Sequence, residues 1–135
     1  MIVMKNISEK IFSFFKLGFS LYTIEHYIDT STEINFLDVG CGSSAPANTV
    51  NRFPKVNYYG IDIVDHTETP EVQKYAKKFY KKDLEDADFK DIPNDFFDVI
   101  SMSHVIEHIS NGVEVIEALI PKLKKVESSI SNFQG

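Results

Sequence analysis

The spacing of apolar residues changes several times along the chain, and each change predicts a helix or a strand. Four short runs rich in β-branched and aromatic residues predict strands. These runs lie at residues 34–39, 56–63, 78–82 and 96–102. Apolar residues three or four apart predict helices that follow the strands. These helices lie at residues 47–53, 69–78 and 113–123. Such alternation predicts an α/β fold with a parallel sheet.

The N-terminal segment has a helical pattern of its own. Residues 5–29 carry apolar side chains mostly three or four apart, which predicts one or two amphipathic helices. They would cover one edge of the sheet or close over a ligand as a lid, and the aromatic stripe favours the first role. The sequence therefore predicts a helical segment at 1–33, an α/β domain at 34–125 and a tail at 126–135.

The first predicted strand runs directly into a glycine turn. Gly40 and Gly42 allow the backbone to turn sharply and to approach a ligand without a Cβ atom in the way. Ser43 or Ser44 can cap a helix that holds Pro46 in its first turn. We therefore expect backbone N–H groups and the positive helix end to face a ligand at the carboxyl edge of the sheet.

Acidic residues stand at the ends of three predicted strands. Asp38 comes two residues before Gly40, and Asp83 follows the third strand. Asp62 ends the second strand, 22 positions after Gly40. In a βαβ nucleotide-binding unit, a carboxylate at this place accepts hydrogen bonds from the ribose hydroxyls. The glycine turn and Asp62 together therefore predict a nucleotide-like ligand.

Composition and charge narrow the range of functions. The chain has 135 residues, a net charge of −6 and 43% hydrophobic residues, which indicates one globular domain without the basic surface typical of nucleic-acid binding. No apolar run approaches the roughly 20 residues of a membrane span. Cys41 is the only cysteine, and the N-terminus lacks the pattern of a secretory signal. We therefore expect a cytoplasmic protein.

These segments together resemble the first half of a class I S-adenosyl-L-methionine-dependent methyltransferase. The motifs that carry the resemblance are Asp38-Val-Gly40-Cys-Gly42, Gly60-Ile-Asp62, Lys82-Asp83-Leu84 and Phe97-Asp98-Val-Ile-Ser-Met-Ser-His-Val-Ile-Glu107-His108-Ile. The last motif is most similar to the small-molecule methyltransferases of ubiquinone and menaquinone biosynthesis. The resemblance implies a Rossmann-like sheet with strand order 3-2-1-4 and helices on both faces. It also implies S-adenosyl-L-methionine as cofactor, S-adenosyl-L-homocysteine as product, residues 34–125 as the cofactor-binding domain and a small-molecule acceptor.

The resemblance further implies a role for each matched residue. It places Asp38 near the amino group of the methionine part of the cofactor. The same methionine part would be approached by the turn, which holds Gly40, Cys41 and Gly42, and lined by Ser103 and His104. At the adenosine end it places Asp62 on the ribose hydroxyls, and Ile63, Asp83 and Leu84 at the adenine. Since the methyl group is already activated, such an enzyme mainly aligns the nucleophile. Glu107 or His108 would act as a base for a protonated nucleophile, although His108 could equally cap or pack a helix.

Two features depart from the family pattern. Ser44-Ala45 stands where the first motif often has a third glycine, which small residues tolerate. The Pro-Gly-Gly turn before a fifth strand is absent from residues 124–129, and the closing hairpin has no counterpart. The sequence therefore predicts a sheet truncated relative to the seven-stranded methyltransferase fold. Its apolar edge would invite a second copy or a partner that completes the sheet.

Another class of enzyme fits part of the same pattern. Gly40, Gly42 and Ala45 with Asp62 further on also match the dinucleotide fingerprint of a nicotinamide-dependent oxidoreductase. Asp38 argues against this alternative, because a carboxylate facing the turn suits an ammonium group and would repel a pyrophosphate.

Two further alternatives remain. His104, Glu107 and His108 match the H-x-x-E-H motif of a zinc hydrolase, although the motif follows a buried strand within a nucleotide-type unit. We expect no metal at this place. The truncated sheet also fits a non-catalytic module that binds the cofactor and needs a partner.

Overall fold

The computed structural model describes residues 2–5, 12–14, 29–102 and 108–125 of the chain. The strands in this part are β1 (Ile2–Lys5), β2 (Phe12–Phe14), β3 (Ile34–Val39), β4 (Val56–Asp62), β5 (Ala76–Lys81) and β6 (Val99–Met102). The α-helices are α2 (Ala45–Arg52), α3 (Pro70–Tyr75) and α4 (Gly112–Leu119), and the 3₁₀ turns are η1 (Leu84–Asp86) and η3 (Ile120–Lys122). None of the helices in these ranges has the length and apolar character that crossing a bilayer requires.

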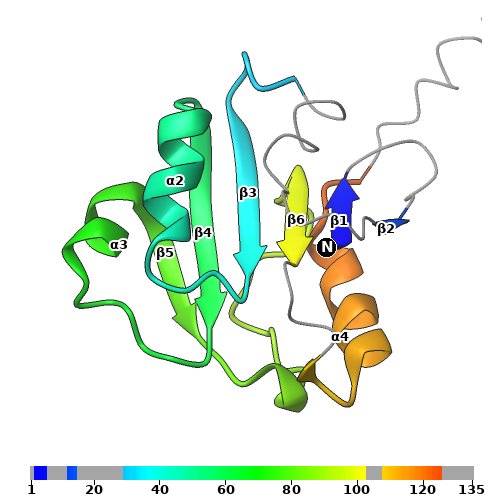
Figure 1. Cartoon of the computed structure of the whole chain (residues 1–135). Helices are drawn as coiled ribbons and strands as arrows, with labels where there is room; N and C mark the ends of the chain where they lie inside the picture. Colours follow the sequence, from blue (N-terminus) through cyan, green and yellow to red (C-terminus); the bar gives the residue numbers. More distant parts are fainter. Residues whose placement is uncertain (1, 6–11, 15–28, 103–107, 126–135) are drawn as a thin grey trace, which may run out of the picture.

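The strands form one sheet in the order β2-β1-β6-β3-β4-β5 (Figure 1). Strands β6, β3, β4 and β5 run parallel, whereas β1 is antiparallel to both β6 and β2. The four strands predicted from the sequence correspond to β3, β4, β5 and β6, so the parallel part has the predicted order 3-2-1-4. The prediction of a mostly parallel, Rossmann-like sheet is confirmed. The carboxyl ends of these four strands therefore lie on one edge.

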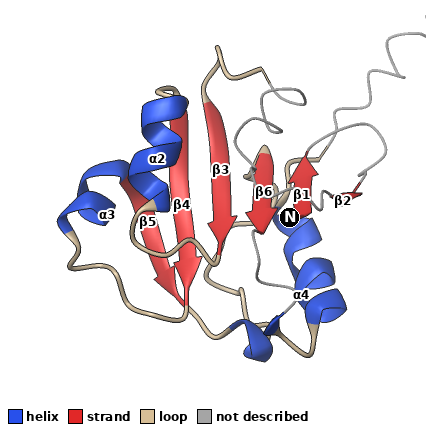
Figure 2. Ribbon diagram, viewed as in Figure 1, coloured by secondary structure: helices blue, strands red, loops and turns tan. Residues whose placement is uncertain are grey.

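Helices cover both faces of the sheet, as predicted (Figure 2). On one face, Leu37 of β3 belongs to a buried cluster that includes Val115 of α4. On the other face, Phe36 and Tyr58 form a cluster against which Val50 of α2 packs. Because consecutive residues of a strand point to opposite faces, Phe36 and Leu37 assign α2 and α4 to opposite sides of the sheet.

The N-terminal segment differs from the prediction. Residues 12–14 lie within the segment predicted to be helical, but they form strand β2, so the prediction is wrong for these residues. The physical reason is pairing over a long sequence distance. Strand β1 binds the outer edge of β6, with Ile2 opposite Met102 and Lys5 opposite Val99, and β2 then pairs with β1. Residues 2–5 of the same segment form strand β1 and residues 29–33 are not helical, so the prediction is wrong there too. Residues 1, 6–11 and 15–28 lie outside the described residues, and the division of the chain into three segments remains a prediction.

Several elements are shorter than predicted, and α3 and β6 differ most clearly. Helix α3 is shorter because residues 76–81 pair with β4 as strand β5. Strand β6 is shorter because the N–H groups of Phe96 and Phe97 both donate to the carbonyl of Lys122, at 3.0 Å each. Phe97 also forms an isolated parallel bridge with Leu123. The chain after α4 therefore returns alongside the start of β6. Completion of the sheet by a partner or a second copy remains a prediction, although β1 pairs with the edge of β6.

Candidate functional site

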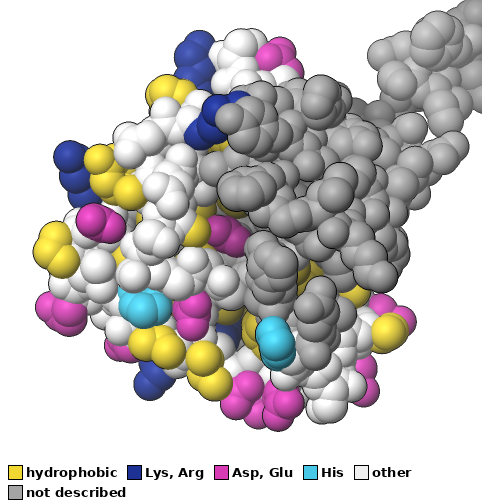
Figure 3. Space-filling view, viewed as in Figure 1, with side chains coloured by type: hydrophobic (Ala, Val, Ile, Leu, Met, Phe, Trp, Pro, Cys, Tyr) yellow, Lys and Arg dark blue, Asp and Glu magenta, His cyan; other side chains and the backbone are white. Residues whose placement is uncertain are grey.

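A cavity of about 250 Å³ opens at the carboxyl ends of β3, β4 and β5. It is lined by Gly40, Asp62, Ile63, Asp83, Leu84, His108 and Ile109. Six of these seven residues were predicted as site residues, so the fold brings together candidates that lie up to 68 positions apart in the sequence. The parallel strands point toward the lower side of the view in Figure 1. On the same side of Figure 3, exposed hydrophobic side chains lie beside acidic ones.

The glycine turn is bound to β4. Gly40 and Gly42 both have left-handed backbone conformations, with φ of 75° and 67°, which favour glycine. The N–H groups of Gly40 and Cys41 donate to the carbonyl of Ile61 at 2.7 and 3.1 Å, and the N–H of Gly42 donates to Asp62 Oδ2 at 2.7 Å. The expectation that these N–H groups face a ligand is therefore wrong, because the neighbouring strand already binds them.

The start of α2 follows the prediction only in part. Ser44 is the N-cap residue and Pro46 lies in the first turn, as expected. The Ser44 side chain makes no capping hydrogen bond, however. The helix start is therefore set by the turn and the proline more than by a serine cap.

Cys41 and Gly60 explain how closely the turn approaches the sheet. A Cβ atom on Gly60 would lie 2.8 Å from Cys41 Sγ, so only glycine fits on β4 beneath this side chain. Burial raises the pKa of the Cys41 thiol to about 12, which keeps it protonated. The side chain packs with the core cluster on the α2 face and is not part of the cavity lining.

Asp62 connects the turn with the cavity. Its carboxylate accepts hydrogen bonds from the backbone N–H groups of Gly42, at 2.7 Å, and Val64, at 3.0 Å. An ionised carboxylate has about four acceptor positions, so capacity for ligand hydroxyls remains. The adjacent Ile63 is 59% exposed and offers an apolar surface at the same cavity.

The opposite wall of the cavity is held by a residue that the sequence did not single out. Asn111, the N-cap residue of α4, donates through Nδ2 to the carbonyls of Leu84 (3.3 Å) and Glu85 (2.9 Å). These bonds join the loop that carries Asp83 to the start of α4. Asp83 itself caps the start of η1, where its side chain accepts a hydrogen bond from the N–H of Glu85 at 3.0 Å. An asparagine just before helical periodicity is a recognisable cap signal, and it could have identified Asn111.

Asp38 is buried beside the cavity and is not part of its lining. Its Oδ2 accepts a hydrogen bond of 2.6 Å from the hydroxyl of Tyr58 on β4. Burial raises the pKa of Asp38 to about 7, with a smaller contribution from the charge of Asp62, whereas the Tyr58 bond lowers it. Among the residues that the structure describes, no cation forms an ion pair with Asp38. The role of Tyr58 was missed because the sequence marks it only as a strand-forming residue.

The remaining predicted residues fall into two groups. Ser103, His104 and Glu107 lie outside the described residues, so the role of Glu107 as a base and the zinc alternative both remain predictions. His108 is described, and its exposed side chain lies at the cavity.

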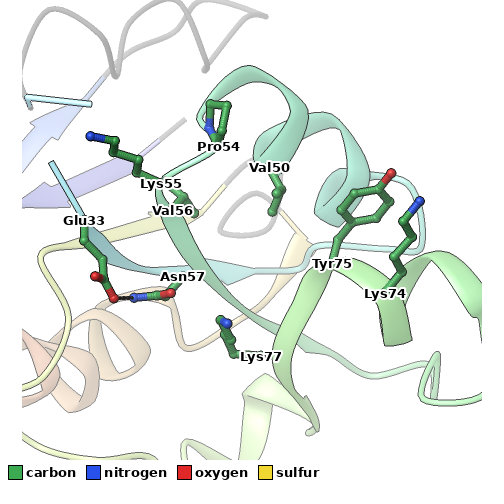
Figure 4. A pocket seen from close by; sticks show the side chains of 9 residues that line it. All are labelled: Glu33, Val50, Pro54, Lys55, Val56, Asn57, Lys74, Tyr75 and Lys77. Atoms are coloured by element: carbon green, nitrogen blue, oxygen red, sulfur yellow. Dashed lines mark hydrogen bonds between the residues drawn. The ribbon is translucent and has the colours of Figure 1, made fainter. Parts of the chain in front are cut away.

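A second cavity lies near the amino ends of β3, β4 and β5 and has a volume of about 590 Å³ (Figure 4). It is lined by Glu33, Val50, Pro54, Lys55, Val56, Asn57, Lys74, Tyr75 and Lys77. Asn57 donates to Glu33 at 2.8 Å across its floor. The amino groups of Lys55 and Lys74 point in different directions in Figure 4 and do not converge on one ligand group. This cavity is larger, but it contains none of the predicted site residues.

The strand order, the glycine turn and the carboxylates at the strand ends define a Rossmann-like α/β fold with a candidate ligand site at the carboxyl edge of its sheet. A family model described as a methyltransferase domain matches residues 21–129, and the chain belongs to this family. A comparison with curated proteins found no match.

Solved structures show the same fold. A candidate S-adenosyl-L-methionine-dependent methyltransferase from Methanococcus maripaludis has a TM-score of 0.60 and 13% identity, with 77% of this chain and 49% of that chain covered. The YcgJ protein from Bacillus subtilis has a TM-score of 0.59 and 20% identity, with 77% and 45% covered. A SAM-dependent methyltransferase from Aquifex aeolicus has a TM-score of 0.58 and 20% identity, with 78% and 59% covered. The chain thus spans about half the length of these proteins.

Proposed function

We propose that the protein binds S-adenosyl-L-methionine and transfers its methyl group to a small-molecule acceptor. The observation that carries the proposal is the pair of carboxylates at the ends of β3 and β4. Asp62 lines the cavity and has acceptor capacity left, and Asp38 is buried beside it without a cation among the described residues. A nucleoside that also carries an ammonium group satisfies both carboxylates. Membership of a methyltransferase family supports the same ligand.

The residues of the cavity fit the adenosine part of this cofactor. Asp62 would accept hydrogen bonds from the ribose hydroxyls, and the exposed side chain of Ile63 would pack on the adenine ring. Asp83 would accept a hydrogen bond from the adenine amino group, with Leu84 beside it. The volume of about 250 Å³ lies just below the range of cavities that enclose drug-sized ligands, which suits a nucleoside.

The contribution of the protein to catalysis is mainly positional. When bound, the cofactor supplies a methyl group that its sulfonium has already activated. The chain holds the adenosine part at the carboxyl edge and orients the ammonium group at Asp38, which fixes the direction in which an acceptor must approach. His108 is exposed at the cavity and would accept a proton from an acceptor hydroxyl.

The geometry of the turn disfavours the oxidoreductase alternative. Dinucleotide-binding proteins use the N–H groups of their glycine turn to hold a pyrophosphate. Here the N–H groups of Gly40, Cys41 and Gly42 are bound to Ile61 and Asp62. A pyrophosphate would have to displace these bonds and would approach the carboxylate of Asp62.

Calorimetric titration of the chain with S-adenosylhomocysteine and with NADH tests the proposal. We expect one site for S-adenosylhomocysteine and none for NADH. Asp62→Asn should weaken binding about 10- to 100-fold, because hydrogen bonds to a charged group contribute roughly 1.5–3 kcal/mol. Asp65→Asn is the matched control. Like Asp62, Asp65 accepts a hydrogen bond from the backbone N–H of the residue two positions later, here Thr67 at 3.0 Å, but it does not line the cavity.

Two outcomes would overturn the proposal. The first is a folded chain that binds NADH and not S-adenosylhomocysteine. The second is an equal loss of affinity in the Asp62 and Asp65 variants, which would place the ligand elsewhere. Release of S-adenosylhomocysteine from S-adenosylmethionine in the presence of phenol and quinol acceptors then separates an enzyme from a non-catalytic binding module.

A further inference from the structure

We propose that Tyr58 is a positioning residue for the ammonium group of the cofactor, because its hydroxyl orients the carboxylate of Asp38. The inference rests on the proposed function. It assigns a role to a residue outside the motifs that carry the family resemblance.

The geometry of the pair is fixed by the sheet. Tyr58 lies opposite Phe36 in the parallel register, and their rings are stacked with centroids 6.0 Å apart. Asp38 lies opposite Gly60, which has no side chain. The Tyr58 ring therefore extends along β4 past Gly60, and its hydroxyl reaches Asp38 Oδ2 at 2.6 Å. Tyr58 is fully buried, so water does not compete for this hydrogen bond.

Among the residues that the structure describes, Tyr58 is the group that favours the charge of Asp38. Within the same residues, the other titratable groups that act on this pair are the Cys41 thiol of the turn and the Asp62 carboxylate at the end of β4. Strand β6 contributes Ser101, opposite Asp38, which does not titrate in this range. Helix α2 covers this face, and its one charged side chain, Arg52, stands in the last turn. The ammonium of the ligand would therefore supply the positive charge at this place.

This arrangement has a consequence for the pH dependence of binding. Burial raises the pKa of Asp38 to about 7, so the affinity for an ammonium ligand should fall as the pH decreases through this value. The Tyr58 hydrogen bond lowers the pKa. Removing the hydroxyl should therefore move the midpoint of the binding profile upward, by about one to two pH units for a hydrogen bond to a charged group.

The test compares two ligands and two variants from about pH 5.5 to about pH 8.5. S-adenosylhomocysteine carries the ammonium group, whereas 5′-methylthioadenosine shares the adenosine part and lacks it. The difference between their profiles separates the pH dependence of the ammonium site from that of the adenosine cavity. Tyr58→Phe keeps the stacked ring and removes the hydroxyl. Tyr59→Phe is the matched control, because the Tyr59 ring packs edge-on against Phe96 and Phe97, at 5.5 and 5.3 Å.

We expect Tyr58→Phe to bind S-adenosylhomocysteine about tenfold more weakly than wild type near pH 7 and to regain affinity near pH 8.5. Binding of 5′-methylthioadenosine by this variant, and of both ligands by Tyr59→Phe, should match wild type. An unshifted midpoint in Tyr58→Phe would overturn the role of Tyr58. Failure of both ligands to bind wild type would instead overturn the proposed function.

A second variant keeps the test decisive if Tyr58→Phe does not fold. Asp38→Asn preserves the shape of the side chain and removes its charge. It should abolish the difference in pH dependence between the two ligands and weaken only S-adenosylhomocysteine. Equal weakening of both ligands would show that Asp38 does not face the ammonium group.

Discussion

Gly60→Ala should destabilise the protein because of one side chain, that of Cys41. Gly60 lies in β4 opposite Asp38, and a Cβ atom there would be 2.8 Å from Cys41 Sγ. The next atoms, Cε1 of Tyr58 and Cδ2 of Phe79, would lie at 3.4 and 3.5 Å, close to ordinary contact. The sulfur sits on a short side chain in a buried cluster, so the strand or the turn must shift to relieve the contact.

The magnitude follows from two opposing effects. Forcing an extra carbon into a packed core costs about 1–3 kcal/mol. In a strand without a clash, Gly→Ala stabilises by about 0.4–1 kcal/mol, because the unfolded chain loses conformational freedom. The difference between these two effects predicts that Gly60→Ala destabilises the wild type by up to about 2.6 kcal/mol. In a Cys41→Ala background the sulfur is absent, and the same substitution should be neutral or stabilising.

Urea unfolding followed by circular dichroism measures all four proteins of this double-mutant cycle. Gly42→Ala is the control, since its cost comes from the left-handed φ of 67° and an added Cβ meets nothing within 4 Å. That cost, about 1–2 kcal/mol, should be unchanged by Cys41→Ala. If Gly60→Ala costs the same with and without the Cys41 sulfur, the steric explanation is wrong.

Two further predictions concern carboxylates. Asp38→Asn should flatten the pH dependence of stability. The pKa of Asp38 is about 7 in the folded protein, against an ordinary value of 3.8 for an aspartate in the unfolded chain. As the pH rises, Asp38 therefore loses its proton in the unfolded chain before it does so in the folded protein. The wild type should therefore lose stability as the pH rises from about 4 to about 7, more steeply than the variant in urea unfolding. Asp98→Ala should cost about 1–3 kcal/mol, because Asp98 accepts the N–H of Asn35 at 2.7 Å. Lys124→Met should lower the free energy of unfolding by less than about 1 kcal/mol, since the Lys124 side chain is 41% exposed in its 3.1 Å ion pair with Asp98. Equal losses in Asp98→Ala and Lys124→Met would contradict the expectation that the hydrogen bond to Asn35 contributes more than the ion pair.

The parallel sheet and the cavity could be predicted because their signals are local and their geometry is general. Runs of β-branched and aromatic residues identify the strands. Asp38, Asp62 and Asp83 each stand at or near the carboxyl end of a strand, and parallel strands end on one edge of a sheet. Asp62 and Asp83 therefore had to lie near each other once the strand order was known, and both line the cavity.

The N-terminal strands could not be predicted because their pairing is not local. Residues 2–5 pair with residues 99–102, which lie 94 to 100 positions further along the chain of 135 residues. The three- and four-residue spacing of the segment favours a helix by itself, but an unpaired strand edge binds short apolar segments in extended form. Spacing carries no information about that edge.

The hydrogen-bond partners of the turn and of Asp38 also could not be predicted from the sequence. The glycines indicate a turn, but only the structure shows that the N–H groups of the turn bind Ile61 and Asp62. Similarly, strand alternation places Tyr58 and Asp38 on one face, but the reach of the tyrosine hydroxyl depends on the missing side chain at Gly60.

The two carboxylates at the strand ends are prepared for a ligand in different ways. Asp62 is held by two backbone N–H groups, so its orientation is set before a ligand arrives, and it secures the turn at the same time. Asp38 has a single hydrogen bond from Tyr58 among the described residues. A preorganised carboxylate adds affinity without a cost of ordering, whereas a buried carboxylate with few partners binds a cation only when it is ionised. Affinity for the adenosine part should therefore follow Asp62, and the pH dependence of binding should follow Asp38 and Tyr58.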